Sequence, residues 1–289
     1  MSSLAIPRPN ASQWDLWRSQ AGAILSVELR KNFITKRGFW IYLLALAPAA
    51  IIWLHSIVSL RRPDFTGHPF SKDIEILAGI FQIFFLRPAV YFGCVGIFTY
   101  LFRGEVVERT LHYYFLSPVR REVLVAGKYL AGLITAAFFF CGSIALCFTG
   151  MYAHFPAHEI RAYLLDGPGI GHLFAYVGIT FLACMAYGAL FLWLGIRYKN
   201  PIIPAVVLLF WESFNIFLPA WLKKASILYY LRSLTPVEPH FYGPGALVGG
   251  VADPASASVA IVSLFAITSV LLLLASSELK RSEISYSSD

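Results

Sequence analysis

The chain has 289 residues, of which 58% are hydrophobic and only 13% are charged. A soluble globular protein has about 25% charged residues, so this composition excludes a chain that lies mainly in water. The net charge of +7 comes from short basic clusters between apolar runs. Such clusters are typical of membrane topology signals and not of one nucleic-acid-binding patch, so no nucleic-acid partner is expected.

The first 37 residues are expected to form a cytoplasmic N-terminal segment. Within them, the stretch WDLWRSQAGAILSVELRKNFITKRG predicts an amphipathic helix lying in the inner membrane interface, with its cations near anionic lipid. Arg18 and Glu28 fall within or beside its apolar stripe, and a plain extension of the first span is the alternative. The stripe consists of Trp14, Trp17, Ala21, Leu25, Leu29 and Phe33.

Six apolar runs are each long enough to cross a bilayer as a helix, which needs about 20 residues. Lipid forces the backbone to satisfy its own hydrogen bonds, so helices are the default. The predicted fold class is an all-α polytopic membrane protein, with a six-span domain over residues 38–277 and a cytoplasmic tail over 278–289. The runs are 38–60, 76–102, 123–152, 169–195, 201–221 and 256–277.

The distribution of Lys and Arg predicts the orientation. With the N-terminus inside, the inner segments and Lys128 hold 15 of the 23 basic residues, and the outer segments hold seven. This bias predicts that both termini are cytoplasmic and that the protein lies in the plasma (inner) membrane as a multi-pass protein.

Two charged residues lie near the middle of predicted spans. Arg87 is in the second span and Glu212 is in the fifth. An isolated charge at that depth costs about 2.5–3.5 kcal/mol, so such groups face a protein interior or a watery cavity. Three interpretations stay open: an Arg87–Glu212 ion pair, a polar lining of a translocation path that includes Asn215, or a second span that begins later and lets Arg87 reach the outer interface.

Between the second and third spans lies the segment RGEVVERTLHYYFLSPVRRE, residues 103–122, with four arginines and three glutamates. Residues 104–116 are compatible with a short helix. Ser117 is then a suitable N-cap and Pro118 a suitable first residue for a second helix that enters the third span. A segment of this length exceeds what a connector needs, which predicts a docking surface for a soluble partner. An ordinary basic loop that fixes topology is the alternative.

Cysteine and histidine give no sign of a metal site or a disulfide framework. The four cysteines lie inside apolar runs, which predicts free thiols buried as small hydrophobic groups. His154 and His158 are separated by Pro156 in a predicted outer loop, so helical metal-ligand geometry is not expected there. No cofactor is therefore expected in this chain.

The stretch GEVVERTLHYYFLSPVRREVLVAGKYLAG resembles the cytoplasmic connector of type-2 ABC exporter permeases. Many members have Gly immediately before the Thr-Leu pair, whereas this chain has Arg109. The interfacial helix, the six spans and the long outer segment before the last span also resemble the family's layout. The elements that carry the resemblance are Glu105, Glu108, Arg109-Thr110-Leu111, Pro118-Val119-Arg120-Arg121 and Gly127-Lys128-Tyr129-Leu130.

The resemblance implies a permease subunit that pairs with a second copy or a paralogue and exports a drug, lipid or glycan-type cargo. A separate soluble ABC ATPase, which binds ATP and magnesium, would receive the 103–122 segment as a coupling helix. Short re-entrant helices within 222–255 would close the outer end of the path, with an interfacial aromatic belt as the alternative. The residues implied in ATPase coupling are Glu105, Glu108, Arg109, Thr110, Leu111, Tyr114, Pro118, Arg120 and Arg121.

The chain contains no phosphate-binding loop of its own. The nearest match, VLVAGKYL, lacks the first Gly, and Tyr129 follows its Lys where Ser or Thr is needed. ATP-driven transport therefore requires a second chain. The alternatives are a membrane enzyme that modifies lipid and a scaffold that transports nothing. The enzyme would need paired acid–base or nucleophilic groups, and the sequence offers no convincing set.

Overall fold

The structure is a computed structural model whose regular elements are helices. No strand occurs among the residues that it describes, and five of its helices are long and apolar enough to cross a membrane. The predicted all-α polytopic fold class is confirmed. The residues described are 13–34, 38–61, 69–107, 119–213, 222, 224–239 and 254–281.

The long helices lie close to the runs expected from the sequence. The second is longer than its apolar run and continues from Phe70 to Val107. In the fifth apolar run the helix is α9, which ends at Ser213 and is shorter than the run. Residues 214–221 lie outside the described part, so the count of six spans stays a prediction. The helices are α1 (Gln13–Ile34), α2 (Gly38–Arg61), α3 (Phe70–Ile80), η2 (Phe81–Tyr91), α4 (Phe92–Val107), α6 (Arg121–Tyr152), α7 (Ala157–Arg161), η3 (Ala162–Asp166), α8 (Gly169–Arg197), α9 (Ile202–Ser213), α11 (Ile227–Ser233) and α13 (Ala257–Arg281).

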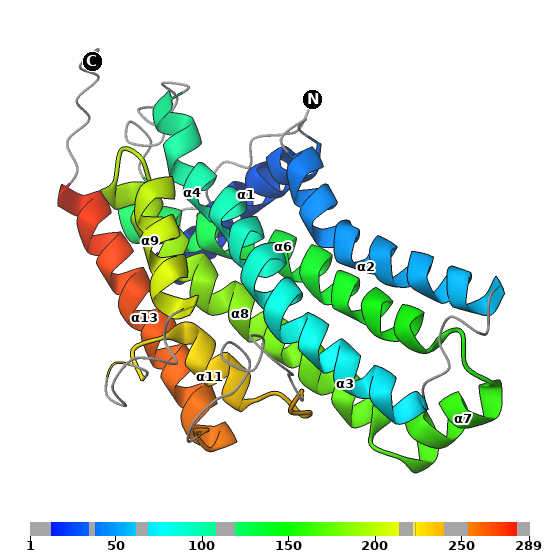
Figure 1. Ribbon diagram of the computed structural model, residues 1–289. Coiled ribbons are helices and arrows are strands. Elements are labelled where there is room, and N and C mark those ends of the chain that lie inside the picture. Colours follow the sequence, from blue (N-terminus) through cyan, green and yellow to red (C-terminus); the bar gives the residue numbers. More distant parts are fainter. Residues whose placement is uncertain are drawn as a thin grey trace.

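The central helix of the bundle is α8, which packs against α4, α6 and α13 (Figure 1). In the most apolar window of α8, 72% of the residues are buried, against 17% in α13 and 22% in α2. Apolar side chains on those peripheral helices face outward, where lipid is the solvent that suits them. The α8 helix therefore forms the core, while α2 and α13 form part of the lipid-facing surface.

Glycine brings α8 close to α4. A Cβ atom at Gly195 would lie 2.9 Å from the backbone Cα of Thr99, and one at Gly188 would collide with the ring of Phe98. Close backbone approach at small residues is a general way of packing membrane helices. Lipid tails are as apolar as the helix surfaces, so association of the helices gains little from the hydrophobic effect and depends on close packing. These two glycines fix the spacing of the two helices.

The second long helix changes its winding in the middle. It runs as an α-helix through α3, widens to a π-helix over η2, and returns to α-helix in α4. Pro88 lies inside the widened part and has no N–H to donate, which disrupts the regular ladder there. The helix begins at Phe70, six residues before the expected span, so it gives no support to the interpretation in which the span begins later and Arg87 reaches the interface.

The two ends of the bundle gather different elements. The end of α4, the start of α6 and the end of α13 lie together at the top of Figure 1, and α7 and α11 lie at the bottom. At the top, Lys280 pairs with Glu122 at 2.6 Å and joins α13 to α6. We call this the α4/α6 end; both flanks of the 103–122 segment meet there.

Candidate functional site

A buried lysine lies at the α4/α6 end. The Lys128 ammonium is fully buried and donates three hydrogen bonds, to Glu28 Oε1 and Glu105 Oε1 at 2.7 Å each and to the Leu101 carbonyl at 2.9 Å. An ammonium has three donors, so its hydrogen-bonding capacity is filled. Lys128 thereby joins α6 to α1 and α4.

A second lysine balances the charge of this group. Lys31 lies 3.4 Å from Glu105 and 3.6 Å from Glu28. Two ammonium groups therefore face two carboxylates, which reduces the large cost of burying any one of these charges alone. We call Lys128, Glu28, Glu105 and Lys31 the Lys128 cluster.

The local sequence explains why α1 reaches this cluster. A Cβ atom at Gly127 would lie 3.1 Å from Ile24 Cγ2, so glycine allows α1 to pack closely on α6. Ile24 and Glu28 are four residues apart, on one face of α1, and both are buried. The sequence suggested that Glu28 interrupts a lipid-facing stripe; in the structure it faces the bundle and pairs with the residue that follows Gly127.

The other flank of the 103–122 segment is held by two arginines. The Arg120 guanidinium lies 4.8 Å from the ring centroid of Trp17 on α1. Arg121 Nη1 donates to the carbonyls of Leu279 at 2.6 Å and Lys280 at 2.7 Å. A cation on the last carbonyls of a helix satisfies acceptors that have no partner within the helix. This flank is therefore tied to α1 and to the end of α13.

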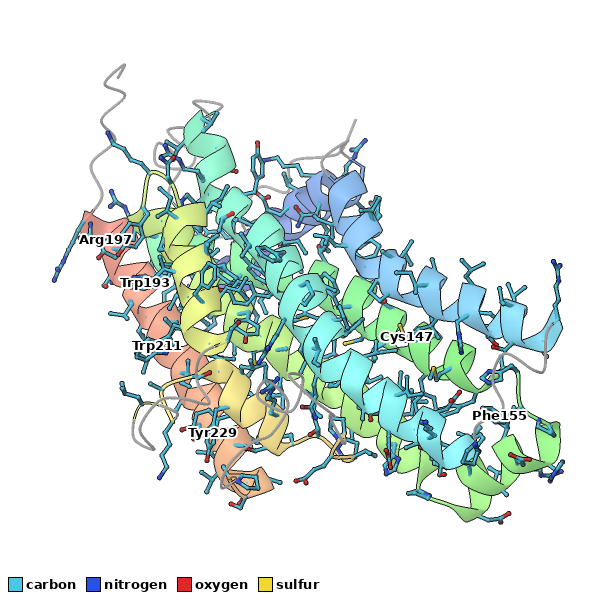
Figure 2. The ribbon with its side chains drawn as sticks, in the orientation of Figure 1. Cys147, Phe155, Trp193, Arg197, Trp211 and Tyr229 are labelled. Carbon is cyan, nitrogen blue, oxygen red and sulfur yellow. The ribbon has the colours of Figure 1, made fainter. Side chains whose placement is uncertain are left out.

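The α8 helix joins α13 at the same end. Arg197 lies 3.5 Å from Glu278, and Figure 2 shows Arg197 beside the last turns of α13. Both groups are partly exposed, so this pair contributes little stability by itself. It nevertheless places a second helix, besides α6, in direct contact with the end of α13.

The predicted coupling residues fall into two groups. Glu105 is 5% exposed, and its carboxylate contacts lysines of this chain; a direct contact with an ATPase stays a prediction, as it does for Arg120 and Arg121. The remaining predicted residues, together with the expected helix break at Ser117, lie outside the described residues. These are Glu108, Arg109, Thr110, Leu111, Tyr114 and Pro118.

A second polar cluster surrounds Glu212 at the end of α9. Tyr187 on α8 donates to Glu212 Oε2 at 2.6 Å, and the backbone N–H groups of Ile227 and Leu228 donate to Oε1 at 3.1 and 3.3 Å. The Ser226 hydroxyl donates to the same oxygen at 3.3 Å. A carboxylate that accepts from the first amides of a helix satisfies donors that lack partners within that helix. Glu212 therefore joins α8 and α9 to the start of α11.

Two arginines lie near this carboxylate. Arg87 and Arg232 both interact electrostatically with Glu212 and Tyr187. Burial lowers the pKa of Arg232, which is on α11 and outside the five long helices, to about 9, and the charge of Arg87 adds to this shift. The structure thus brings Arg87 and Glu212 into one neighbourhood, but the hydrogen bonds of Glu212 go to Tyr187, Ser226 and α11. A direct Arg87–Glu212 ion pair stays a prediction, and Asn215 lies outside the described residues.

The short helix α11 and the cysteines bear on two other expectations. The segment 222–255 contains a short helix in its described part, whereas the re-entrant course that the family resemblance implied and the role in closing a path stay predictions. The four cysteines are free, as expected; three of them are buried, whereas Cys141 is half-buried. His154 lies 3.4 Å from Asp73, whereas His158 is on α7 and mostly exposed.

Sequence reasoning missed the partners of Glu28 and Glu212. Lys128 entered the sequence analysis as a topology signal and as part of a family motif, and Tyr187 did not enter it at all. A lysine six residues inside an apolar run was nevertheless a usable signal, because a charge at that depth needs carboxylates.

Comparison with known proteins places this architecture in a family. The model of the ABC-2 family transporter protein matches residues 24–215, about two thirds of the chain. The match extends from α1 through α9 and includes Glu28, Glu105 and Lys128. No curated protein matches the chain. The chain therefore belongs to the ABC-2 transporter family, and it is a multi-pass membrane subunit, the permease of an ABC transporter, and not an enzyme itself.

Proposed function

We propose that a separate ATP-hydrolysing subunit drives this permease by docking on the 103–122 segment, and that the Lys128 cluster transmits the movement to the bundle. The observation that carries the proposal is the fully buried Lys128, which holds Glu28 of α1 and Glu105 of α4 at 2.7 Å each. Glu105 is the third residue of the segment, so a displacement of the segment displaces the cluster.

Anchors on both sides of the segment support transmission. The Lys128 cluster anchors the side of the segment that joins α4. On the side that joins α6, Arg120 contacts α1 and Arg121 contacts α13. A flexible connector would absorb the movement of a docked partner, whereas a segment tied on both sides passes it to four helices. Contiguous networks of packed and paired groups are the physical means for such coupling.

The family and the surface chemistry support the rest of the proposal. ABC-2 permeases are membrane subunits, and this chain has no phosphate-binding loop in its sequence. We infer a pairing with a second copy or a paralogue, with export of a drug, lipid or glycan-type cargo. The bias of basic residues toward the α4/α6 end supports a cytoplasmic position for that end, with both termini, at the plasma (inner) membrane.

The test replaces Glu108 with Arg in the full chain, purified with its ATPase partner in lipid nanodiscs. The reversed charge is expected to abolish transport-coupled ATP hydrolysis while insertion into the membrane stays normal. Glu159→Arg is the matched control, because Glu159 lies on α7 at the opposite end. Normal coupling in Glu108→Arg, or an equal loss in Glu159→Arg, would contradict docking on this segment.

A further inference from the structure

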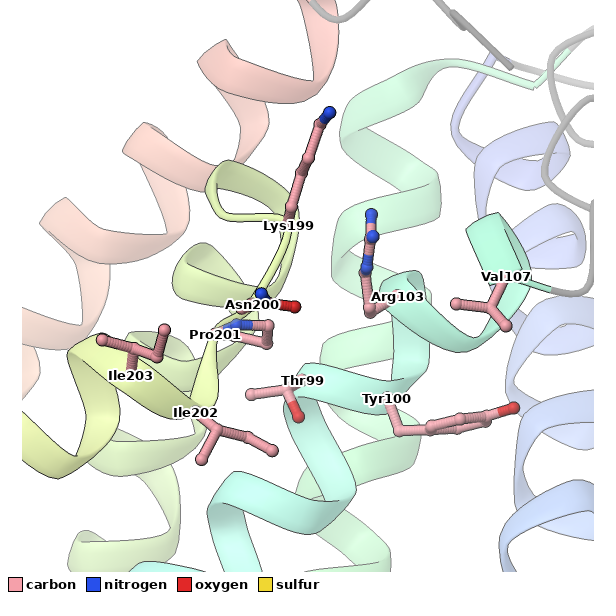
Figure 3. Close-up of a pocket in the computed structure, with 9 residues that line it drawn as sticks. All are labelled: Thr99, Tyr100, Arg103, Val107, Lys199, Asn200, Pro201, Ile202 and Ile203. Carbon is pink, nitrogen blue, oxygen red and sulfur yellow. The ribbon is translucent and has the colours of Figure 1, made fainter. Parts of the chain in front are cut away.

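A pocket lies at the α4/α6 end between the last turns of α4 and the connection from α8 to α9. Its volume is 530 Å³. Figure 3 shows the Arg103 and Lys199 side chains extending in the same direction, with Asn200 below Lys199 and beside Arg103, and with Thr99 and Ile202 lower still. The pocket therefore has a cationic rim on one side and a largely apolar floor on the other.

The two rim cations differ from their neighbours. Neither Arg103 nor Lys199 makes an ion pair or a side-chain hydrogen bond with any residue in the described part of the chain. At the same end, Arg197 faces Glu278 and Lys280 faces Glu122. Two cations beside one pocket with no carboxylate among the lining residues produce a positive potential that an anion would neutralise.

The floor of the pocket continues onto an apolar surface. Four apolar side chains of α9 point outward there and are each at least 60% exposed: Ile202, Ile203, Val207 and Phe210. Val107, at the end of α4, is 69% exposed on the other side of the pocket. In a membrane protein such a surface faces acyl chains, since water does not solvate it well. An occupant that suits both parts of the site carries an anion at one end and hydrocarbon at the other.

We propose that this pocket binds one anionic membrane phospholipid. Its phosphate lies between Arg103 and Lys199 within reach of the Asn200 amide, and its acyl chains run along the apolar face of α9. Guanidinium and ammonium groups are the usual phosphate partners, and basic pockets between helices at the cytoplasmic side recognise lipid headgroups. An acidic protein loop would satisfy the cations and leave the apolar wall uncovered, so a lipid fits better than a protein partner.

The lipid would act as a structural bridge. It would hold the end of α4, which carries Arg103, against the α8–α9 connection, which carries Lys199. Arg103 lies two residues before Glu105, so the bridge borders the Lys128 cluster without belonging to it. The proposal does not depend on docking of an ATPase, and either proposal can fail while the other holds.

The experiment is native mass spectrometry of the full chain in detergent, with phosphatidylglycerol and phosphatidylcholine of identical acyl chains as the probes. The wild-type chain is expected to retain one phosphatidylglycerol in preference to phosphatidylcholine. The double variant Arg103→Gln/Lys199→Gln is expected to lose about 25-fold in affinity for phosphatidylglycerol, because each of the two cations near an anionic lipid contributes on the order of a fivefold gain.

Two control variants distinguish an effect of this pocket from an effect of net charge. Lys224→Gln/Arg281→Gln removes the same net charge from two exposed cations outside the pocket and is expected to retain the lipid. Arg103→Lys/Lys199→Arg keeps both charges and is also expected to retain it. Unchanged melting temperatures of all variants in lipid-free detergent verify that folding is intact.

Four results would overturn the proposal. The first is equal retention of both lipids by the wild type, and the second is unchanged phosphatidylglycerol binding in Arg103→Gln/Lys199→Gln. The third is an equal loss of phosphatidylglycerol affinity in the control Lys224→Gln/Arg281→Gln. The fourth is displacement of the lipid by glycerol phosphate at equal concentration, which would make the site one for a soluble anion. A double variant that keeps its lipid but loses its ATPase partner would assign the two cations to a protein interface.

Discussion

At the scale of single residues, both polar clusters follow the same physical rule. A charge inside a membrane bundle persists when its hydrogen-bonding capacity is filled and its charge is balanced. Lys128 has three acceptors around three donors, and Glu212 has four donors around two oxygens. Each cluster joins three helices, so single substitutions there are expected to affect the packing of several elements at once.

Lys128→Met is expected to destabilise the protein by about 3 kcal/mol or more, because it removes the buried ammonium that lies 2.7 Å from both Glu28 and Glu105 and leaves these carboxylates buried without it. The measurement is the thermal unfolding of the purified chain in detergent. Lys280→Met is the control: it removes a half-exposed ion pair with Glu122 and is expected to cost less than about 1 kcal/mol. Equal stability of the two variants would show that the buried contacts of Lys128 do not stabilise the fold.

Exchange of charges in Arg87→Glu/Glu212→Arg is not expected to restore the protein. A simple ion pair would tolerate the exchange, but the amides of Ile227 and Leu228 need an acceptor at position 212 and an arginine has none. Expression and melting temperature are therefore expected to be lower than in Glu212→Gln, which keeps an accepting oxygen. Recovery of both in the exchanged variant would instead establish a direct Arg87–Glu212 pair as the main interaction.

At the scale of elements, the bundle depends on close helix contacts at glycine and on ties at the helix ends. The α4–α8 contact passes through Gly195, and the α1–α6 contact passes through Gly127. Small residues at such contacts let backbones approach, so added volume has to be accommodated by moving a whole helix.

Gly195→Ala is expected to destabilise the protein by about 1–3 kcal/mol, because its Cβ atom would lie 2.9 Å from the Thr99 backbone, which cannot rotate away. Gly178→Ala, in the same helix, has open space around its Cβ and is expected to be neutral or to stabilise by up to ~1 kcal/mol through the lost backbone entropy of glycine. Melting temperatures of the two variants in detergent compare them directly. A Gly195→Ala variant as stable as Gly178→Ala would contradict the tight α4–α8 contact.

The apolar runs predicted the long helices well, because lipid leaves a chain little choice besides a helix and the run length reports where it crosses. Hydropathy began the second run at residue 76, whereas the helix starts at Phe70 and includes the buried Asp73. The extension lies against neighbours that the local sequence does not show, such as His154, whose Nε2 is 3.4 Å from Asp73 Oδ2. The inward position of Glu28 was equally hidden, since its partner Lys128 lies 100 residues away along the chain.

At the scale of the whole molecule, a central helix, lipid-facing outer helices and one charged end divide the bundle into parts with different tasks. The central helix α8 holds the spacing of the helices that pack against it. The α4/α6 end gathers the ends of α4 and α13 and the start of α6. Our account assigns transmission of an ATPase cycle to that end. Docking and transmission must then be separable, because Lys128, Glu28 and Glu105 of the cluster are buried and the 103–122 segment continues beyond them.

Glu28→Gln in the full permease–ATPase complex tests this central claim most directly. Glu28 is the member of the cluster that lies on α1, outside the docking segment, and it pairs with Lys128 at 2.7 Å. The account predicts that the complex still forms with wild-type affinity while transport-coupled ATP turnover falls about tenfold, equivalent to ~1.4 kcal/mol of lost coupling. Glu278→Gln, which removes a partly exposed pair with Arg197, is expected to leave turnover within about twofold. Wild-type turnover in Glu28→Gln, or loss of the complex itself, would contradict the account.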